Sequence, residues 1–387
     1  MSKRKNGEGS WGKKTINGYL YHYYRDSDGR YTYGKTMKEV NEKLKEKEKK
    51  KYVLSEKTTF GEYITNWLVT VKLGNIEDTT YDCYETMISS QILKFKGYNI
   101  SNKQMHQLSS EVFQKYVNSL AEYFSRSTIT KIWAIIKQCI VYAEVKGEIQ
   151  PHTTKLVNIP IESAVAVKKK EIPFLSKEDA ELFYQTAQMT KPNGEPLYGV
   201  NAPVAVFIMY SGLRVSEALG LKWKNVDFEN NKIKIVESLA IKKNRDAKDN
   251  DYKYIEYDKA PKSKDSVRTV PLPARAIAIL KMFEARNPKH KDNDYVFTNK
   301  NGDTIERRQL NRTIRGIAKR SKCSVEDFTV HTLRHTYGSI LIAEGVDIKK
   351  VSELLGHSDI TITYNIYIGI LESDKQKEVE RVFNQKV

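Results

Sequence analysis

Six side chains of the types that bind and cleave a phosphodiester lie in the C-terminal half of the sequence. They are Arg214 in SGLRVSEALG, Lys264 in PKSKDSVRTVPL, His331 and Arg334 in HTLRH, His357 in LLGHSD, and Tyr367 in TITYNIYIG. An arginine can bind two phosphate oxygens at once and stays charged at neutral pH. A tyrosine hydroxyl can attack phosphorus if an imidazole accepts its proton, and a lysine can protonate the departing sugar oxygen. If these groups converge on one phosphate, they can cleave it without a metal ion.

Two of these residues have alternatives in the immediate sequence. Arg214 lies three positions before Glu217 at the start of an apolar helical segment, so the two side chains can form an intrahelical ion pair. The nucleophile has two candidates, Tyr364 and Tyr367, which lie three positions apart on one expected helix and can face the same side. Spacing alone therefore leaves both the arginine's role and the choice of tyrosine open.

The histidines also have alternative interpretations. His331 and His335 are four positions apart, as two metal ligands on one helical face would be, but a zinc-protease motif has Glu where this chain has Thr332. We therefore expect no metal site and interpret His335 as a packing or hydrogen-bonding histidine. His357 follows Gly356 at an expected helix end, where capping is an alternative role.

The composition favours a polyanionic partner. The 387 residues include 65 Lys and Arg against 48 Asp and Glu, a net charge of +17, and nucleic acid is the first partner to consider for such a balance. Three widely spaced cysteines predict neither a disulfide framework nor a cysteine metal cluster, which is typical of a reducing cytosol. We expect no signal peptide, membrane span or cofactor.

Residues 1–57 are expected to form a small α+β DNA-binding domain, because they carry 16 Lys and Arg against 8 Asp and Glu. TINGYLYHYYRD and GRYTYGKT have the alternating pattern of strands, and the following segment has helical spacing, so a small sheet plus a helix is predicted. Its alternating tyrosines either contact DNA or form the core of the domain. The basic candidates for DNA contact are Lys13, Lys14, Arg25, Arg30 and Lys35.

Residues 58–159 are expected to form an all-helical domain, since four segments have apolar residues at helical spacing. Trp67, Trp133, Ile136 and Ile140 are assigned to its core. Residues 160–172 read as a basic linker that can follow a DNA backbone. The DNA-contact candidates of these two regions, which could also be ordinary solvated surface, are Arg126, Lys131, Lys137, Lys168, Lys169 and Lys170.

Residues 173–387 are expected to form a mainly helical domain with a small antiparallel sheet. Three strand-like runs, KIKIVESLAI, YKYIEYDKAP and VRTVPL, interrupt the helices, and Lys264 falls in the turn before the last of them. The C-terminal segment after Tyr367 has apolar residues at helical spacing, which either pack on their own domain or dock on a neighbouring subunit.

As an ordered set over more than 150 residues, these motifs resemble the tyrosine recombinases, or phage integrases, and the layout is similar to integrases of conjugative transposons and temperate phages of Gram-positive bacteria. The resemblance implies a mainly helical catalytic domain preceded by an arm-binding and a core-binding domain. It implies that Arg214, Arg334 and His357 bind the phosphate and that Tyr367 is the nucleophile. It also implies that His331 accepts or donates a proton and that Lys264, with Lys262 in reserve, is the general acid.

The resemblance implies site-specific recombination of double-stranded DNA through a 3′-phosphotyrosyl intermediate and a Holliday junction. Core-type and arm-type DNA sites, a homo-tetramer, an excisionase and a host DNA-bending protein are the implied partners, and the bacterial cytoplasm, at the nucleoid, is the implied location. Two alternatives remain: a type IB topoisomerase-like relaxing enzyme and a non-catalytic DNA-binding regulator. Neither explains the basic N-terminal region and the ordered motifs together.

Overall fold

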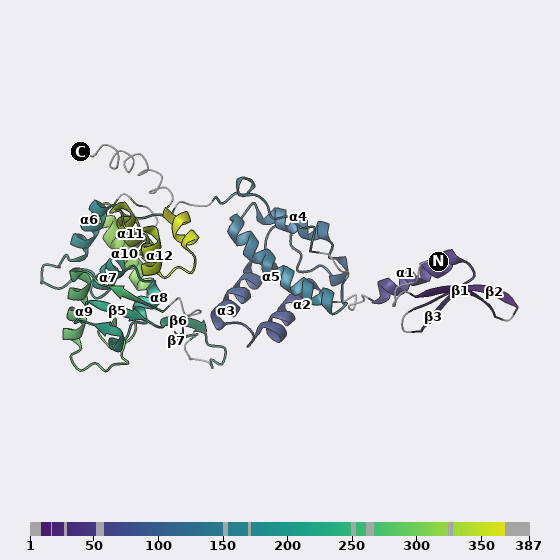
Figure 1. Ribbon diagram of the computed structural model, residues 1–387, viewed down its shortest axis with the longest axis horizontal. Helices are drawn as coiled ribbons and strands as arrows, with labels where there is room; N and C mark the ends of the chain where they lie inside the picture. The colour runs from purple at the N-terminus through teal and green to yellow at the C-terminus, as the bar shows by residue number, and fades with distance from the viewer. Residues whose placement is uncertain are drawn as a thin grey trace, which may run out of the picture. The chain divides into compact units, whose positions relative to one another are not determined.

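The chain divides into two compact units, residues 1–169 and 170–387, which are described separately (Figure 1). Among the described residues, no helix has the length and apolar character needed to cross a membrane. The computed structural model describes residues 9–16, 18–26, 29–51, 58–149, 154–168, 172–248, 253–260, 267–323, 325 and 328–367, with the backbone alone over 45–51.

Unit 1 begins with an antiparallel sheet of three strands in the order β1-β2-β3, followed by helix α1. Val40 of α1 is fully buried, and a Cβ on Gly34 would lie 2.9 Å from it, so the helix packs closely on the end of β3. The predicted sheet and helix are confirmed. The elements are β1 (Ser10–Ile16), β2 (Tyr19–Arg25), β3 (Tyr31–Gly34) and α1 (Met37–Lys51).

The run TINGYLYHYYRD, expected to be one strand, is instead divided between two. Ile16 pairs with Tyr19, and Gly18 between them has φ of 80°, the left-handed conformation that a two-residue hairpin turn demands. The rings of Tyr23, Tyr31 and Tyr33 contact one another, which supports a packing role for these three tyrosines.

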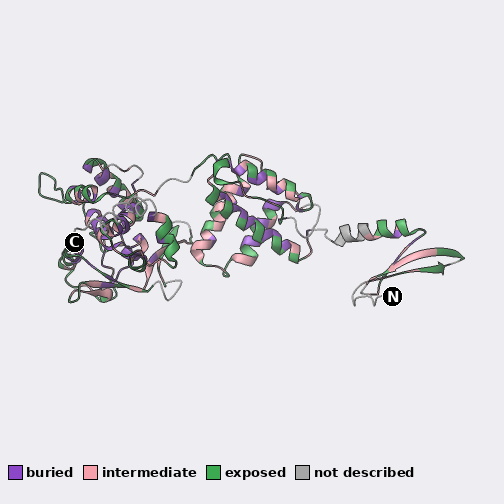
Figure 2. Ribbon diagram, turned by 45° about the horizontal axis from the view of Figure 1, so that its top comes forward, coloured by how far each residue is buried: buried purple, intermediate pink, exposed green. Residues whose placement is uncertain are grey.

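The rest of unit 1 is helical, as expected. Buried residues line the inward sides of its helices (Figure 2), and the core includes Trp67, Trp133, Ile136 and Ile140 as assigned from the sequence. The elements are α2 (Phe60–Trp67), the π-helix η1 (Leu68–Lys72), α3 (Asp78–Met87), the π-helix η2 (Ile88–Leu93), the 3₁₀ turn η3 (Met105–Gln107), α4 (Ser110–Leu120), α5 (Arg126–Val145) and the 3₁₀ turn η4 (Glu162–Ala164).

Unit 2 is built around α7, which is buried on nearly all sides and contacts α6, α9, α10 and α11. Residues 360–367 are also helical. The helices are α6 (Lys177–Ala187), α7 (Asn201–Ser211), α8 (Val215–Leu219), the 3₁₀ turn η5 (Trp223–Asn225), α9 (Ala274–Arg286), α10 (Arg307–Ser321), α11 (Val330–Ala343) and α12 (Ile348–Leu355).

The strand-like runs of unit 2 form two small antiparallel sheets. The run KIKIVESLAI, expected to be one strand, contributes β5 to one sheet and β6 to the other. Strand order is β4-β5-β8 in the first sheet, and β6 pairs with β7 as a hairpin. The strands are β4 (Val226–Asp227), β5 (Lys232–Ile235), β6 (Ser238–Lys243), β7 (Tyr254–Lys259) and β8 (Arg268–Pro271).

Replacing Phe113 with Ala should lower the free energy of unfolding of unit 1 by about 3–5 kcal/mol, the usual cost of a large cavity in a core. Its ring is fully buried and lies against Phe60 and Trp133, with centroids 6.2 and 5.4 Å away. Urea unfolding of the full chain, followed by tryptophan fluorescence, measures the change. Val145→Ala is the control, because this side chain is 84% exposed and its loss should change stability by less than about 0.5 kcal/mol.

Candidate active site

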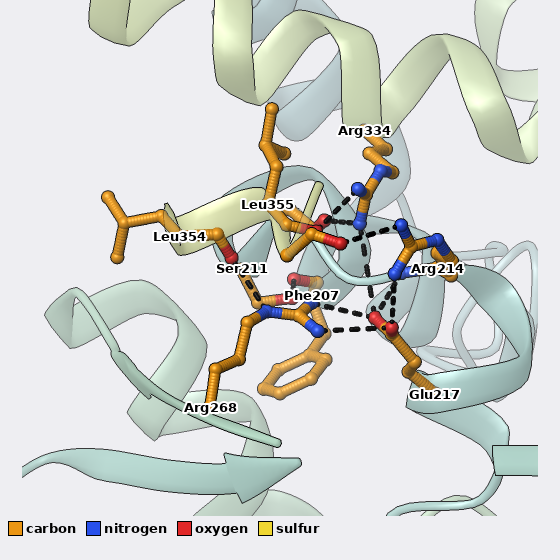
Figure 3. Close-up of polar contacts among 10 residues, drawn as sticks. Phe207, Ser211, Arg214, Glu217, Arg268, Arg334, Leu354 and Leu355 are labelled. Carbon is orange, nitrogen blue, oxygen red and sulfur yellow. Dashed lines mark hydrogen bonds and ion pairs between the residues drawn. The ribbon is translucent and has the colours of Figure 1, made fainter. Parts of the chain in front are cut away.

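The carboxylate of Glu217, in α8, binds the guanidinium groups of two arginines from different segments (Figure 3). Arg214, the residue before α8, donates from Nη1 to Oε1 at 2.7 Å. Arg268, the first residue of β8, donates from Nη1 and Nη2 at 3.1 and 2.8 Å, a bidentate pair. The ion pair weighed from the sequence for Arg214 therefore exists, and a second arginine completes it.

Arg334, from α11, is the third arginine of this cluster. Its Nη1 lies 3.9 Å from Glu217 Oε2 and donates to the carbonyl of Gly212 at 2.8 Å. Gly212 ends α7 with φ of 65°, and a Cβ there would lie 2.4 Å from the ring of Tyr337, so only glycine fits this turn. The turn at the end of α7 thus supplies the carbonyl that accepts a hydrogen bond from Arg334, and Arg214 follows two residues later.

The three arginines also bind three consecutive carbonyls at the C-terminal end of α12. Arg268 donates to Leu354 at 2.8 Å, Arg334 to Leu355 at 2.6 Å, and Arg214 to Gly356 at 2.9 Å. The last carbonyls of a helix have no partner within it and carry partial negative charge, so cations are favourable there. His357 follows these carbonyls directly, and its position is therefore fixed by the arginines.

The cluster holds more positive than negative charge. All ion pairs of Arg214, Arg268 and Arg334 within the described residues are with Glu217. Burial alone would raise the pKa of Glu217, but the hydrogen bond from Arg268 and the charges of the three arginines lower it to about 2. Burial and the neighbouring Arg214 lower the pKa of Arg334 to about 9. Three guanidinium groups beside one carboxylate are suited to bind an anion such as a phosphate.

The nearby histidines are neutral at physiological pH. Burial, together with the charges of Arg334 and Arg214, lowers the pKa of His357 to about 4, and its Nδ1 lies 2.8 Å from the hydroxyl of Thr363. Burial and the charges of Arg307 and Arg334 also lower the pKa of His331. A neutral imidazole has one nitrogen free to accept a proton and another that donates a hydrogen bond.

His335 is the more buried of the two histidines of α11. Burial lowers its pKa to about 4, and its Nδ1 has no hydrogen-bond partner among the described residues. Its ring lies edge-on to that of Tyr367, with centroids 6.4 Å apart. These contacts support the packing role expected for it.

Tyr367 is buried, whereas Tyr364 is 44% exposed, so the two candidate nucleophiles do not face the same side. Tyr367 packs in a small apolar cluster with Ile342, Val351 and Leu355. Its hydroxyl has no hydrogen-bond partner among the described residues. Burial raises the pKa of this hydroxyl to about 12, although Arg334 lowers it in part.

The structure brings together Arg214, Arg334 and His357, with His331 and Tyr367 within electrostatic reach of Arg334. Lys264 and its alternative Lys262 lie outside the described residues, as do two of the linker candidates, Lys169 and Lys170. The other DNA-contact candidates are all exposed: Lys13, Lys14, Arg25, Arg30, Lys35, Arg126, Lys131, Lys137 and Lys168. Their contact with DNA stays a prediction.

Arg268 was not among the residues predicted for the site, although the alternation of buried residues in VRTVPL indicates that its side chain points inward. Val270 and Leu272, at alternate positions of VRTVPL, are buried. Arg268 continues the same inward face of the strand by the two-residue period. A charged side chain at an inward position needs a buried partner, and that partner is Glu217.

Family models match two regions of the chain. The model named "Phage integrase family" matches residues 173–373, which is more than half of the chain, and "Phage integrase, N-terminal SAM-like domain" matches residues 59–121. The chain belongs to the phage integrase family. It is therefore a tyrosine recombinase, an enzyme of site-specific DNA recombination, and nothing favours the topoisomerase or regulator alternatives.

Relatives of this recombinase match along most of its length. The tyrosine recombinase XerC-like protein of Caldanaerobacter subterraneus subsp. tengcongensis is 31% identical, with 92% of this chain and 93% of that protein covered. The integrase of Staphylococcus phage L54a is 25% identical, with 91% and 99% covered. These matches include both units.

Solved structures share the fold. The Tn1549 transposon integrase in complex with a circular intermediate DNA has a TM-score of 0.64 at 19% identity, with 80% of this chain and 94% of that one covered. A lambda integrase tetramer bound to a Holliday junction has a TM-score of 0.58 at 13% identity, with 94% and 96% covered. The expected fold class of the recombinase is confirmed. It consists of an N-terminal sheet and helix, a helical region and a mainly helical catalytic region.

Replacing Glu217 with Gln should lower the free energy of unfolding of unit 2 by about 3 kcal/mol at neutral pH. A carboxyl pKa lowered to about 2 stabilises the fold above the ordinary value of 4.5, and this contribution is lost as pH falls through the folded pKa. Urea unfolding should therefore show a difference between the variants that shrinks progressively below about pH 4.5. A difference in the free energy of unfolding that does not change with pH would contradict this prediction. The exposed Glu229 provides the control variant, Glu229→Gln.

Replacing Tyr367 with Phe should keep or raise the melting temperature of the recombinase. The buried hydroxyl has no partner among the described residues, and removing an unsatisfied polar group relieves a penalty of about 1–3 kcal/mol. Thermal unfolding of wild type and variant measures this. A clearly lower melting temperature for Tyr367→Phe would mean that the hydroxyl is bonded in solution.

Proposed function

We propose that Tyr367 attacks a scissile phosphate of duplex DNA while Arg214, Arg334 and His357 bind its non-bridging oxygens. The arginine cluster carries this proposal: three guanidinium groups around one carboxylate leave an excess of positive charge, directly beside His357. Binding a phosphate there would stabilise the charge that develops during the attack, which is commonly the largest contribution to such catalysis.

The reaction is a transesterification. The Tyr367 oxygen forms a bond to phosphorus as the bond from phosphorus to the 5′ oxygen breaks, leaving a 3′-phosphotyrosine. The neutral imidazole of His331 accepts the tyrosine proton, and Lys264 donates a proton to the departing 5′ oxygen. Attack of a 5′-hydroxyl from the partner strand reverses these steps, so neither ATP nor a metal ion is consumed.

The buried position of Tyr367 links activation to movement. Its hydroxyl, with a pKa of about 12 where it lies, ionises poorly there. Movement toward a phosphate bound by Arg214 and Arg334 would expose the hydroxyl to their charges, which favour the phenolate. Tyr364, which is exposed and three positions earlier, is assigned a structural role.

The wider recombination complex is proposed from the layout of the chain. Residues 1–57 would bind arm-type sites, 58–159 core-type sites, and 173–387 would perform the chemistry, with 160–172 as linker. Integration and excision of a mobile element would proceed in a homo-tetramer through a Holliday junction. An excisionase and a DNA-bending host protein would be accessory partners, and the reaction would take place at the nucleoid in the cytoplasm. Support comes from the complexes of Tn1549 and lambda integrases with DNA and from the basic surface residues.

A nicked suicide DNA substrate, from which the cleaved end diffuses away, tests the assignment of the nucleophile. Incubated in EDTA without ATP, the wild-type protein should form an adduct that survives denaturation, because the covalent bond needs neither metal nor nucleotide. Tyr367→Phe should form none, and the matched control Tyr364→Phe should form it at the wild-type level. Adduct with Tyr367→Phe, or its absence only in Tyr364→Phe, would refute the assignment.

A further inference from the structure

Thr363, within the helical residues 360–367, is a fully buried threonine whose hydroxyl contacts one of the site residues. Its Oγ1 lies 2.8 Å from Nδ1 of His357, and the residue is 0% exposed. This nitrogen is the only hydrogen-bond partner of the hydroxyl in the part of the chain that the structure describes. A buried hydroxyl thus meets the imidazole that is proposed to bind a phosphate.

Either Oγ1 or Nδ1 could supply the proton between them, and the two cases give different tautomers of His357. If Thr363 donates to Nδ1, the ring proton is on Nε2; if Nδ1 donates to Thr363, Nε2 is left as an acceptor. Burial and the charges of Arg334 and Arg214 lower the pKa of His357 to about 4, so the ring carries a single proton at neutral pH. The choice of donor therefore decides what Nε2 can do.

The burial of Thr363 favours its hydroxyl as the donor. A threonine hydroxyl has one hydrogen, and if Nδ1 were the donor, that hydrogen would need a second acceptor. No other described residue accepts it, and solvent does not reach the side chain. A buried donor without an acceptor is unfavourable by roughly a factor of ten or more. The tautomer in which Thr363 donates to Nδ1 avoids this cost.

The tautomer with the proton on Nε2 also matches the role proposed for His357. An Nε2–H can donate to a non-bridging phosphate oxygen, whereas an unprotonated Nε2 would direct a lone pair at the anion. His357 is half-buried, and its Nε2 forms no hydrogen bond within the described residues. The carbonyl of Gly356 accepts from Arg214 at 2.9 Å, so the backbone that precedes the imidazole is held as well.

We propose that Thr363 is a positioning residue for His357: its hydroxyl donates to Nδ1, holds the ring proton on Nε2 and directs Nε2–H toward the phosphate. This inference rests on the proposed role of His357 as a phosphate ligand. Thr363 is buried, so it would touch neither DNA nor the reacting atoms. It lies four residues before Tyr367 on the same buried face of the helix, so the hydrogen bond also joins His357 to the helix that carries the proposed nucleophile.

Nitrogen-15 NMR of the full chain, labelled in its histidines, tests the tautomer at neutral pH. The protonated and unprotonated nitrogens of a neutral imidazole have well-separated chemical shifts, and the signals of His357 are those lost in His357→Ala. The wild type should show a protonated Nε2 and an unprotonated Nδ1. Thr363→Val, which replaces the hydroxyl with a methyl group, should move the two shifts toward each other as the tautomers mix. Thr363→Ser should restore the wild-type shifts.

Cleavage of the nicked suicide substrate tests whether this contact matters for the reaction. Thr363→Val should cleave about 10-fold more slowly than wild type, as is usual when a contact that fixes the tautomer and orientation of a histidine ligand is lost. Thr363→Ser should cleave at nearly the wild-type rate. In the His357→Ala background, adding Thr363→Val should change the rate by less than about twofold, because the group that Thr363 positions is already absent.

Thr336→Val is the matched control for the loss of a buried hydroxyl. Thr336 is also 0% exposed, and its Oγ1 accepts from the backbone nitrogen of Leu175 at 2.9 Å and donates to the carbonyl of Thr332 at 2.8 Å. This variant should lower the melting temperature but leave the chemical shifts of His357 unchanged. Circular dichroism checks that each variant is folded.

The outcomes separate this inference from the proposed function. A proton on Nδ1 in the wild type would overturn the inference, and this measurement does not depend on the folding of Thr363→Val. Normal cleavage by folded Thr363→Val, or an equal defect of this change with and without His357, would also overturn it alone. Normal cleavage by His357→Ala would instead overturn the proposed phosphate contact of His357, and the positioning role of Thr363 with it.

Discussion

The catalytic unit depends on the binding of three arginines to the end of one helix. The carbonyls of Leu354, Leu355 and Gly356 each accept from a different arginine, and Glu217 is paired with all three of those arginines. Segments far apart in the sequence, those around α8, β8, α11 and α12, are joined in this way at one point. Folding of the domain and assembly of the arginine cluster are therefore the same event.

The same interaction explains what Glu217 contributes to a cluster of three arginines. Three guanidinium groups with no counter-charge would repel one another and lose hydration on burial. One carboxylate reduces this repulsion and still leaves positive charge for a substrate. His357 follows the third carbonyl, and burial together with the charges of Arg334 and Arg214 lowers the pKa of its imidazole.

The fold class could be predicted from the sequence, because periodicity and motif order carry that information. Of the predicted site residues, Arg214 and Arg334 do lie beside His357. Trp133 and Ile136 were assigned to the core from helical spacing, and both are buried. Arg268 was missed, since its burial depends on a partner distant in sequence, Glu217. The contrast between buried Tyr367 and exposed Tyr364 likewise arises from tertiary packing, which a three-residue spacing does not reveal.

The apolar cluster around Tyr367 has a consequence for how often this side chain leaves its buried position. Burying an aromatic side chain of this size is worth about 1.5–3 kcal/mol, and that contribution is lost when the ring leaves Ile342, Val351 and Leu355. At about 2.7 kcal/mol, roughly one molecule in a hundred would have the tyrosine released at equilibrium. If Tyr367 is the nucleophile as proposed, most molecules would hold it away from a substrate, and contacts formed on binding DNA would have to supply the difference in free energy.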